Sequence, residues 1–573
     1  MNKLWKFKPC DDVFATQLFQ CLEEKVPTLG KIPRPLVALL AQRGYRTAEE
    51  VSHFMRCDLA SLRDPFELPD MDKAVARVRC ALADGEKITV FGDYDVDGVC
   101  STALLVRVLR ELGGNVSAFI PSRFDDGYGL SADALTACIA EHNPALIVTV
   151  DCGTSSVAAV EKARAAGVDV VITDHHEPGS QIASAMAVVN PKCAADHPAR
   201  ILAGVGVAFK LCHALIKTGR DNGCLASAAV DLKKYLDFVA VATVTDMVPL
   251  LGENRVLARA GFQSLENSCW PGWNALKKLA GINGTVEAWH AGFAFGPRIN
   301  AAGRVGRPDA ALELLLTDLP ARADELAQLL DTANRERQAI EKDLVHEAIE
   351  EIDSYFDADK NFGLVIAREG WHTGVIGIVA SRLVNRYSRP VVVIGMDGAS
   401  GRGSCRSIDG YNLLDGLGAC ADLLKQFGGH AMAAGLDIEE QNLEAFKARF
   451  NEAVAAQIQG ADLQPILEID RIVMLGEADE ALMDGLKRTG PFGQDNSEPI
   501  WAVCNVKAID SRILKEKHLK LTLSDGKTSR EAIGFNLAEK LPAGLIDVAF
   551  TLQENTWNGR TNLQLNIRDI RPA

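Results

Sequence analysis

The stretch Lys87-Ile-Thr-Val-Phe-Gly-Asp93-Tyr-Asp95-Val-Asp97-Gly98 decides the fold of the region around it. Its apolar, β-branched beginning predicts a buried strand. Three carboxylates at alternate positions and a glycine follow, and the run Ser101–Gly113 predicts a helix with Ser101 near its start. A strand, an acidic turn and a helix make half of a βαβ unit, whose ligands bind at the carboxyl ends of strands. Carboxylates this close repel one another unless a cation neutralises them, and hard oxygen ligands favour Mg²⁺ or Mn²⁺.

Further strands along the chain also end in acidic or imidazole side chains. The strand predicted at 145–150 leads into Asp151, the strand predicted at 168–173 leads into Asp174-His175-His176, and Asp246 follows a helical segment. A single residue of this kind is usually a cap, a turn or part of a solvated acidic loop. The carboxyl ends of a doubly wound sheet, however, converge on one crevice. We therefore predict one site formed by Asp95, Asp97, Asp151, His175 and Asp246.

The composition limits the class of protein. The chain of 573 residues is too long for one core and predicts three or four domains. Its net charge of −15 argues against a protein that grips nucleic acid over its whole surface, although a local basic groove is compatible with it. The 14 cysteines include no Cys-x-x-Cys pair, which indicates reduced thiols in a cytoplasmic protein. We recognise neither a signal peptide nor a membrane span, so we expect no membrane association.

Changes of pattern along the chain predict five parts. They are an N-terminal lobe (1–75), an α/β domain with a parallel sheet (76–309), a long polar connector helix (310–358), a second α/β domain (359–460) and a β-barrel of the OB type (464–573). The barrel is predicted from short alternating strands such as 519–523 and 563–567. Four basic residues within 512–520 suggest an edge that binds single strands, although such a charge run is more often a solvated face.

The second α/β domain contains three predicted glycine-bearing loops, at 371–374, 401–407 and 428–435. Glycines let backbone N–H groups approach phosphate oxygens, and serine or arginine can complete such a cradle. Each loop taken alone would more often be a turn. The sequence has no Walker-type P-loop motif, which argues against a P-loop nucleotidase.

Several of these motifs occur together in one known superfamily. They are Asp95-x-Asp97, Asp151, Asp174-His175-His176, Gly401-Arg-Gly-Ser404 and Gly428-Gly429-His430. With them, the chain resembles the DHH phosphoesterase superfamily and its DHHA1 companion domain. Segments 296–304, 370–377 and 490–493 bring the resemblance closest to the bacterial exonucleases of this superfamily that degrade single strands. It covers nearly the whole chain from about residue 75 onward.

The resemblance implies two divalent ions, Mn²⁺ or Mg²⁺, with Asp151 bridging them. The implied ligands are Asp95, Asp97, Asp151, His175 and Asp246. Asp93 is a further candidate, although other branches of the superfamily place a histidine a few residues upstream of the Asp-x-Asp, where this chain has Phe91. His176 would contact the scissile phosphate instead of a metal, which completes the implied catalytic set.

The same resemblance implies the substrate contacts. Arg123 would hold the 5′ end of the strand, and Arg298 and Arg304 would meet the charge of the phosphate. The other implied substrate-binding residues are Asn300, His372, Ser404, Arg406, Gly428, Gly429 and His430.

The implied function is 5′-to-3′ degradation of single-stranded DNA to mononucleotides in repair and recombination. The enzyme would act as a monomer, and a helicase and a single-strand-binding protein would supply its substrate. One alternative is a phosphodiesterase of the same superfamily acting on short oligonucleotides or cyclic dinucleotides, which would not need the barrel. The other is a non-catalytic scaffold that grips single strands, which would not need the full set of metal ligands.

Overall fold

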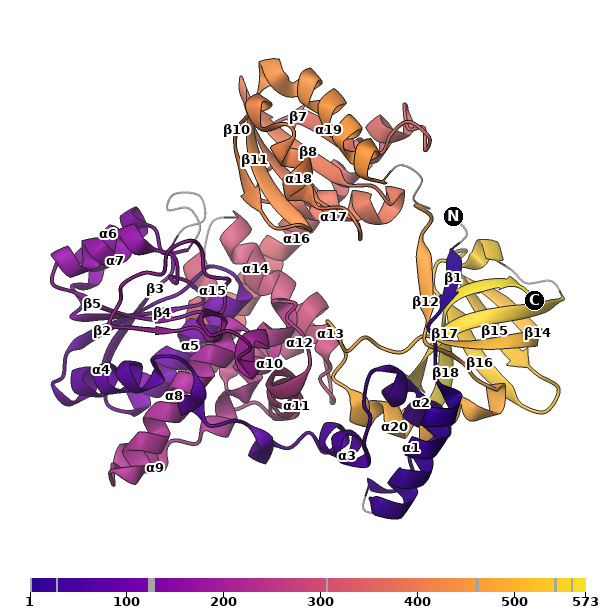
Figure 1. Cartoon of the computed structure of the whole chain (residues 1–573), viewed down its shortest axis with the longest axis horizontal. Helices are drawn as coiled ribbons and strands as arrows, with labels where there is room; N and C mark the ends of the chain where they lie inside the picture. The colour runs from indigo at the N-terminus through magenta and orange to yellow at the C-terminus, as the bar shows by residue number, and fades with distance from the viewer. Residues whose placement is uncertain are drawn as a thin grey trace. The chain divides into compact units, whose positions relative to one another are not determined.

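The computed structural model describes residues 3–26, 29–121, 129–305, 308–458, 463–540, 544–557 and 560–573. The chain divides into two compact units. The larger unit consists of Lys3–Gly296, Leu312–Asp324 and Ile466–Ala573, and the smaller unit contains Pro297–Ala311 and Glu325–Pro465. The larger unit holds a parallel sheet and a β-barrel, and the smaller unit holds a long helix and a mixed sheet (Figure 1). Among the described residues, no helix combines the length and the apolar character needed to span a membrane.

The first sheet of the larger unit has five parallel strands in the order β3-β2-β4-β5-β6. In that order the strands are Asn115–Phe119, Lys87–Phe91, Leu146–Val150, Asp169–Thr173 and Ala187–Val189. Helices cover both faces (Figure 1): α6 (Ala132–His142) and α7 (Val157–Ala165) on one, and α4 (Met71–Ala83), α5 (Val96–Glu111) and α8 (Gly204–Asp221) on the other. The apolar strands β2, β4 and β5 are buried almost throughout, as strands covered on both faces are. The predicted parallel α/β domain is confirmed.

The strand order of this sheet changes direction at β2. The next strand along the chain, β3, pairs with one edge of β2, and the one after it, β4, pairs with the other edge. In open α/β sheets, ligands bind outside the carboxyl ends of the strands at this switch point. The topology therefore places the site next to the ends of β2 and β4.

The helix that follows β2 begins earlier than the sequence predicts. Its start was expected near Ser101, but α5 begins at Val96, and Asp95 is its N-cap, accepting a hydrogen bond from the Gly98 N–H (3.0 Å). Aspartate is among the strongest N-cap residues, and the helix dipole favours an acid in the first turn. The acidic segment therefore starts the helix, and Asp97 lies in its first turn.

A helical layer completes this part of the larger unit. Its helices are α9 (Leu225–Ala229), α10 (Leu236–Thr245), α11 (Gly252–Glu266), α12 (Pro271–Leu279) and α13 (Ala288–His290), followed by a π-helix at Ala291–Phe295. Large aromatic side chains such as Phe238, Trp273 and Phe295 are fully buried in it. This packing fixes the end of α10, where Asp246 is the C-cap.

The smaller unit has a mixed five-stranded sheet in the order β10-β11-β9-β8-β7. In that order the strands are Leu424–Gly429, Ala433–Glu439, Ser400–Arg406, Val391–Asp397 and Leu364–Glu369. Its helices are α14 (Gly296–Val305), α16 (Pro320–Asp353), α17 (Ile376–Tyr387), α18 (Leu413–Gly418) and α19 (Leu443–Ile458). The predicted second α/β domain is confirmed.

Two predicted glycine loops of this domain are strands. Gly401–Arg406 lies in β9, and Gly428 and Gly429 end β10. A Cβ on Gly401 would lie 2.5 Å from the Met396 sulfur, and one on Gly403 would lie 2.8 Å from Leu436 Cδ1. These glycines make room for side chains of neighbouring strands instead of opening a loop.

The connector helix is shorter than predicted. The segment 310–358 was expected to be one helix, but α15 (Pro308–Leu316) ends first and α16 then covers Pro320–Asp353. Pro320 has no N–H to continue a preceding helix and is well suited to the first position of a new one. The break therefore falls directly before this proline.

The C-terminal segment forms the predicted barrel. Its strands are β14 (Trp501–Leu514), β15 (His518–Ser524), β16 (Ser529–Gly534), β17 (Leu545–Trp557) and β18 (Arg560–Pro572). Because β14 pairs with both β15 and β17, the five strands close on themselves. The basic segment is the exposed hairpin between β14 and β15.

The N-terminal segment shares a hydrophobic core with this barrel. Helices α1 (Asp12–Lys25), α2 (Arg34–Gln42), α3 (Ala48–Arg56) and α20 (Glu480–Thr489) contribute residues such as Leu36 and Leu482 to the core that contains Trp501 and Leu521. Strand β1 (Leu4–Phe7) also pairs in parallel with β12 (Ile466–Ile469). Segments from the two ends of the chain therefore fold together.

Candidate metal centre and substrate contacts

The predicted acidic residues gather at the carboxyl edge of the parallel sheet. Asp93, Asp95 and Asp97 follow β2, and Asp151 directly follows β4. Their side chains lie close together because the strand order of the sheet reverses between β2 and β4. Asp151 has a φ of 62°, in the left-handed region that few residues other than glycine adopt. Such backbone conformations are common at functional sites.

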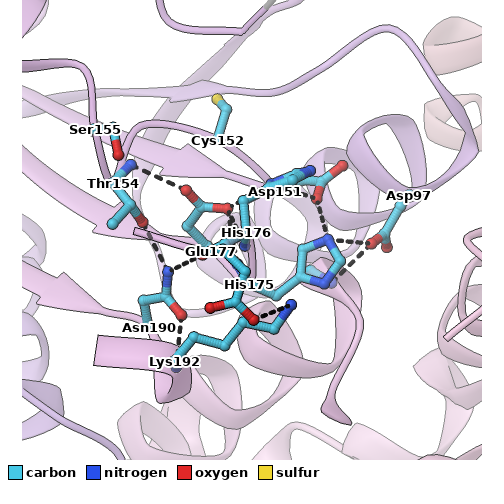
Figure 2. A network of polar contacts seen from close by, with 12 residues as sticks. Asp97, Asp151, Cys152, Thr154, Ser155, His175, His176, Glu177, Asn190 and Lys192 are labelled. Carbon is cyan, nitrogen blue, oxygen red and sulfur yellow. Dashed lines mark hydrogen bonds and ion pairs between the residues drawn. The ribbon is translucent and has the colours of Figure 1, made fainter. Parts of the chain in front are cut away.

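Imidazole and a further carboxylate complete the cluster. His175 follows β5, and its Nε2 lies 3.1 Å from Asp151 Oδ1, 3.6 Å from Asp246 Oδ2 and 3.9 Å from Asp97 Oδ2. Figure 2 shows the imidazole between Asp97 and Asp151. Residues from two strands and two helices thus meet within a few ångströms.

The potential metal ligands fall into two main sets of three. One set is Asp93, Asp95 and Asp151, and the other is Asp97, His175 and Asp246. Within each set the ligand atoms lie within 4.8 Å of one another. A third set joins Asp151 to His175 and His176, so Asp151 is common to two of the three. Every predicted metal ligand, Asp93 included, lies in a set.

The electrostatics of this centre indicate that it holds a cation. Burial, and after it the charge of the neighbouring carboxylates, raises the pKa of Asp97 to about 7 and that of Asp246 to about 9. Burial and the same neighbours also raise the pKa of Asp151. Burial lowers the pKa of His175 to about 3, which leaves a neutral imidazole able to act as a ligand. A divalent cation would relieve the repulsion among the carboxylates.

Buried atoms at the centre also fit a metal. Within the part of the chain that the structure describes, Asp151 Oδ1, His175 Nε2 and Asp246 Oδ2 are buried without a hydrogen-bond partner. Buried polar atoms are rarely left without hydrogen-bond partners, and a bound metal ion would supply the partner that these three atoms lack. Oxygen ligands with one imidazole suit Mn²⁺ or Mg²⁺. The donor set therefore fits the predicted ions.

Backbone amides of α8 position Asp97. Its two carboxylate oxygens accept hydrogen bonds from the N–H groups of Gly204 (2.7 Å) and Val205 (2.9 Å), at the helix N-terminus. A Cβ on Gly204 would lie 2.6 Å from Asp151 Oδ1, so only glycine lets α8 come this close. Sequence reasoning missed Gly204, because its contact joins segments more than fifty residues apart.

Asp174 holds His176 without belonging to a ligand set. Its Oδ1 lies 2.8 Å from His176 Nδ1, and its Oδ2 accepts a hydrogen bond from the Thr154 N–H (2.9 Å). Burial lowers the pKa of His176, but the hydrogen bond and charge of Asp174 raise it more, so the net shift is upward. Figure 2 shows His176 next to His175 and Asp151. Asp174 therefore fixes His176 through its Nδ1.

The predicted substrate contacts of the second α/β domain lie in the smaller unit. Ser404 and Arg406 alternate along β9, and Arg406 Nη1 donates to Ser404 Oγ (3.2 Å). A Cβ on Gly377, in the first turn of α17, would lie 2.9 Å from Ser404 Oγ and 3.1 Å from Arg406 Nη2. These two side chains thus meet at a helix N-terminus, where anions are favoured. Sequence reasoning missed Gly377.

The other predicted residues of this unit have local contacts. His372 Nδ1 accepts a hydrogen bond from the Gly374 N–H (3.1 Å). Gly429 has a φ of 144°, and the His430 N–H donates to the Ala433 carbonyl (2.8 Å) in the turn between β10 and β11. Gly428 is the neighbour of this turn within β10.

The predicted arginines are described only in part. Arg298, on α14, donates to the buried carboxylate of Asp331 (2.9 Å) on α16, which also pairs with Arg335 (2.8 Å). Asn300 lies on the same helix and is partly buried. Arg123 and the side chain of Arg304 lie outside the described residues.

Known protein families match the chain over most of its length. The model of the DHH family, N-terminal domain, matches residues 87–243, the model of the DHHA1 domain matches residues 360–456, and the model of the RecJ OB domain matches residues 469–569. The single-stranded-DNA-specific exonuclease RecJ of Bacillus subtilis is 37% identical over 93% of this chain and 68% of its own length. The enzyme of the same name from Escherichia coli is 36% identical over 96% of this chain and 98% of its own length.

Solved structures agree with these matches. The crystal structure of Thermus thermophilus RecJ with Mn²⁺ has a TM-score of 0.84 and 29% identity, and covers 100% of this chain and 80% of that one. The structure of the same protein with Mg²⁺ has a TM-score of 0.76 and 28% identity, with coverage of 100% and 78%.

Proposed function

This chain belongs to the RecJ family of single-stranded-DNA-specific exonucleases, and from that premise we propose that it degrades single-stranded DNA from the 5′ end to mononucleotides by metal-dependent hydrolysis. The observation that carries the proposal is the pair of ligand sets around Asp151. Asp93, Asp95 and Asp151 would hold one divalent ion, and Asp97, His175 and Asp246 the other, with Asp151 between them. The full set of ligands supports a phosphodiesterase over a non-catalytic scaffold, which would not need all of them.

The residues of the centre have separate tasks in this proposal. Bound Mn²⁺ or Mg²⁺ lowers the pKa of a water and neutralises charge on the phosphoryl group. The carboxylates hold the ions, and Gly204 and Val205 hold Asp97 in place through their N–H groups. His176, fixed through Nδ1 by Asp174, would offer its other ring nitrogen to a phosphate oxygen. No covalent enzyme intermediate is needed.

Contacts to the rest of the strand would come from three surfaces. Ser404 and Arg406 would bind backbone phosphate, and so would His430 in the turn that follows Gly429. Arg123 would hold the 5′ end, and Arg298 and Arg304 would meet phosphate charge. The barrel presents exposed Arg512, Lys515 and Lys517 on its hairpin. Phosphate contacts of this kind give affinity without sequence preference and make binding sensitive to salt.

The first experiment follows both ends of the DNA. A single-stranded oligonucleotide labelled at either end is incubated with Mn²⁺ or with EDTA, and a blunt duplex serves as the control. We expect release of the 5′ label as a mononucleotide, with Mn²⁺ only and from the single strand only. Release of the 3′ label first would overturn the polarity, and equal degradation of the duplex would overturn the strand specificity.

A second experiment separates the exonuclease from a phosphodiesterase of short oligonucleotides. Removing the barrel would expose the core that it shares with α1–α3, so a charge reversal is the better variant. With Lys515→Glu and Lys517→Glu together, an exonuclease should lose affinity for long strands and keep its rate on dinucleotides. Unchanged affinity for long strands would favour the phosphodiesterase. Lys25→Glu, at the exposed end of α1, is the control.

The cellular setting belongs to the same proposal. Single strands arise in DNA repair and recombination, where a helicase and a single-strand-binding protein would supply the substrate in the cytoplasm. All 14 cysteines are free in the structure, as expected for a reducing compartment. Both ligand sets come from one chain, so a monomer would suffice.

A further inference from the structure

A lysine that no prediction included lies at the same edge of the parallel sheet. Lys192 is in the short 3-10 helix Pro191–Cys193 that follows β6, and β6 pairs in parallel with β5. Asn190, which is fully buried, ties this turn to the metal centre. Its Nδ2 donates to the carbonyl of His176 (2.9 Å), and its Oδ1 accepts from the Lys192 N–H (2.8 Å). The backbone of Lys192 is therefore fixed to the segment that carries His175 and His176.

The side chain of Lys192 is largely enclosed although it carries a charge. It is 22% exposed, and its Nζ lies 3.5 Å from Glu177 Oε1. In Figure 2 the side chain extends from the turn beneath His175 towards Glu177. The ammonium therefore lies against Glu177, the residue that directly follows His175 and His176.

Glu177 neutralises the positive charge of Lys192 only in part. Its Oε2 lies 3.3 Å from Arg200 Nη2, so one carboxylate is shared by two cations. The Glu177 side chain is 60% exposed, and ion pairs this open to water contribute little to stability. Lysine presents a compact charge on a flexible stem, which suits a phosphate oxygen. Glu177 therefore leaves part of the positive charge of Lys192 and Arg200 unneutralised beside the segment that carries His175 and His176.

We propose that Lys192 binds a non-bridging oxygen of the phosphodiester that is cleaved, and that Glu177 holds the ammonium in place before the strand arrives. This inference rests on the function proposed above, because it assigns Lys192 to the same substrate. The carboxylates of the centre repel the phosphate, and Lys192 offsets this repulsion from the wall formed by β5 and β6. Lys192 would then be a substrate contact in addition to those that the family resemblance implies.

The first test measures binding without turnover. Affinity for a single-stranded oligonucleotide is followed by fluorescence anisotropy in EDTA over a series of salt concentrations. Lys192→Ala should weaken binding about tenfold, the low end of what a hydrogen bond to a charged group contributes. It should also reduce the slope of log affinity against log salt by about 0.7, the value for one phosphate contact to a single strand. Lys192→Arg should keep most of both, and Lys162→Ala, an exposed lysine on α7, should change neither.

The second test identifies the phosphate. An oligonucleotide with a neutral methylphosphonate at the terminal linkage removes the charge that Lys192 is proposed to contact. On this oligonucleotide, Lys192→Ala should bind as well as the wild type. An equal loss on both oligonucleotides would place the contact elsewhere and overturn the proposal. Glu177→Gln should tighten binding of the unmodified strand, because it frees the ammonium.

A structural role would give a different pattern. If Lys192 and Glu177 only stabilise the fold, both variants should lower the melting temperature and leave the salt slope unchanged, which would overturn the proposal. The failure of the proposed function is distinguishable from this result, because the wild-type protein itself would then neither bind nor degrade single strands. With an active wild type, kcat/KM in Mn²⁺ should fall for Lys192→Ala and stay unchanged for Lys162→Ala.

Discussion

At the scale of single residues, Asp151 is the position on which the metal centre depends most. It belongs to two ligand sets, and its pKa is raised first by burial and then by the carboxylates around it. Asp151→Asn should raise the melting temperature of the metal-free protein, because it removes one repulsive charge. It should also abolish the stabilisation by Mn²⁺, which for a bound ligand amounts to about 2.7 kcal/mol at a hundred times the dissociation constant.

Thermal unfolding with Mn²⁺ and with EDTA measures both effects. Asp133→Asn, an exposed carboxylate of α6, is the matched control and should behave as the wild type. Exonuclease activity of Asp151→Asn should fall more than about 100-fold, since losing even an outer partner of a metal ligand costs 10- to 100-fold. Retained activity in a purified preparation would contradict the assignment.

A second residue links protonation to stability away from the centre. Asp237 is fully buried on α10, its Oδ2 accepts a hydrogen bond from Ser268 Oγ (2.7 Å), and burial raises its pKa to about 7. The folded protein therefore binds this proton more tightly than the unfolded chain does. Between about pH 4 and 7 the contribution of Asp237 should fall as pH rises, by at most about 1.4 kcal/mol per pH unit.

Asp237→Asn should remove this dependence, because an amide does not titrate. The free energy of unfolding, measured by urea denaturation from pH 5 to pH 8, should decline less steeply in the variant than in the wild type. Asp221→Asn, an exposed carboxylate at the end of α8, should keep the wild-type slope. Equal slopes in the wild type and Asp237→Asn would show that Asp237 ionises normally.

At the scale of elements, the start of α8 sets the geometry of the centre. Gly204 donates its N–H to Asp97, and a Cβ there would lie 2.6 Å from Asp151 Oδ1. Gly204→Ala should therefore displace Asp151 and weaken Mn²⁺ binding at least about tenfold, as the loss of a positioning contact does. Isothermal titration with Mn²⁺ measures this change, and circular dichroism checks that the fold is kept.

Gly206 offers a control two residues away on the same helix. A Cβ there would lie 3.2 Å from the end of the flexible Leu202 side chain, which can move aside. Gly206→Ala should keep its affinity for Mn²⁺. If Gly204→Ala also bound Mn²⁺ normally, the close approach of α8 would not be what shapes the site.

Elements differ in how far the sequence predicts them. Strands such as β4 and β5 are apolar and followed by Asp151 and His175, so both the parallel sheet and most of the centre are predictable from local pattern. The predicted start of α5 near Ser101 is wrong. Asp95 is both the N-cap and a candidate ligand, and the acidic pattern around it looks like a turn. The roles of Gly204 and Asn190 depend on contacts between distant segments, which no local pattern records.

The same limit explains the errors in the smaller unit. Gly401 and Gly403 look like loop residues, yet they lie in β9 because Met396 and Leu436 need the space above them. That requirement comes from neighbouring strands, which the sequence of β9 does not reveal. Ser404 and Arg406 were predicted as substrate contacts in a loop, and a strand presents them on one face instead.

At the scale of the whole molecule, Arg255 joins parts of the larger unit that are distant in sequence. It lies on α11, is almost fully buried, and its guanidinium packs 3.7 Å from the ring of Phe54 on α3. It also donates to the carbonyls of Arg488 (2.8 Å) and Thr489 (3.2 Å) at the end of α20. One side chain therefore connects the helical layer beside the metal centre to the helices that share a core with the barrel.

Arg255→Lys should loosen this connection. An ammonium cannot reach all the carbonyls that the guanidinium serves, and each buried group left without a partner costs about 1–3 kcal/mol. In calorimetry, Mn²⁺ should shift the whole unfolding transition of the wild type, because these parts unfold together. In Arg255→Lys we expect two transitions, of which only the one containing the metal centre responds to Mn²⁺. Arg259→Lys is the control: it loses a single hydrogen bond to the same Arg488 carbonyl and should keep one transition. A single Mn²⁺-responsive transition in Arg255→Lys would mean that the barrel and the metal centre are coupled through other contacts.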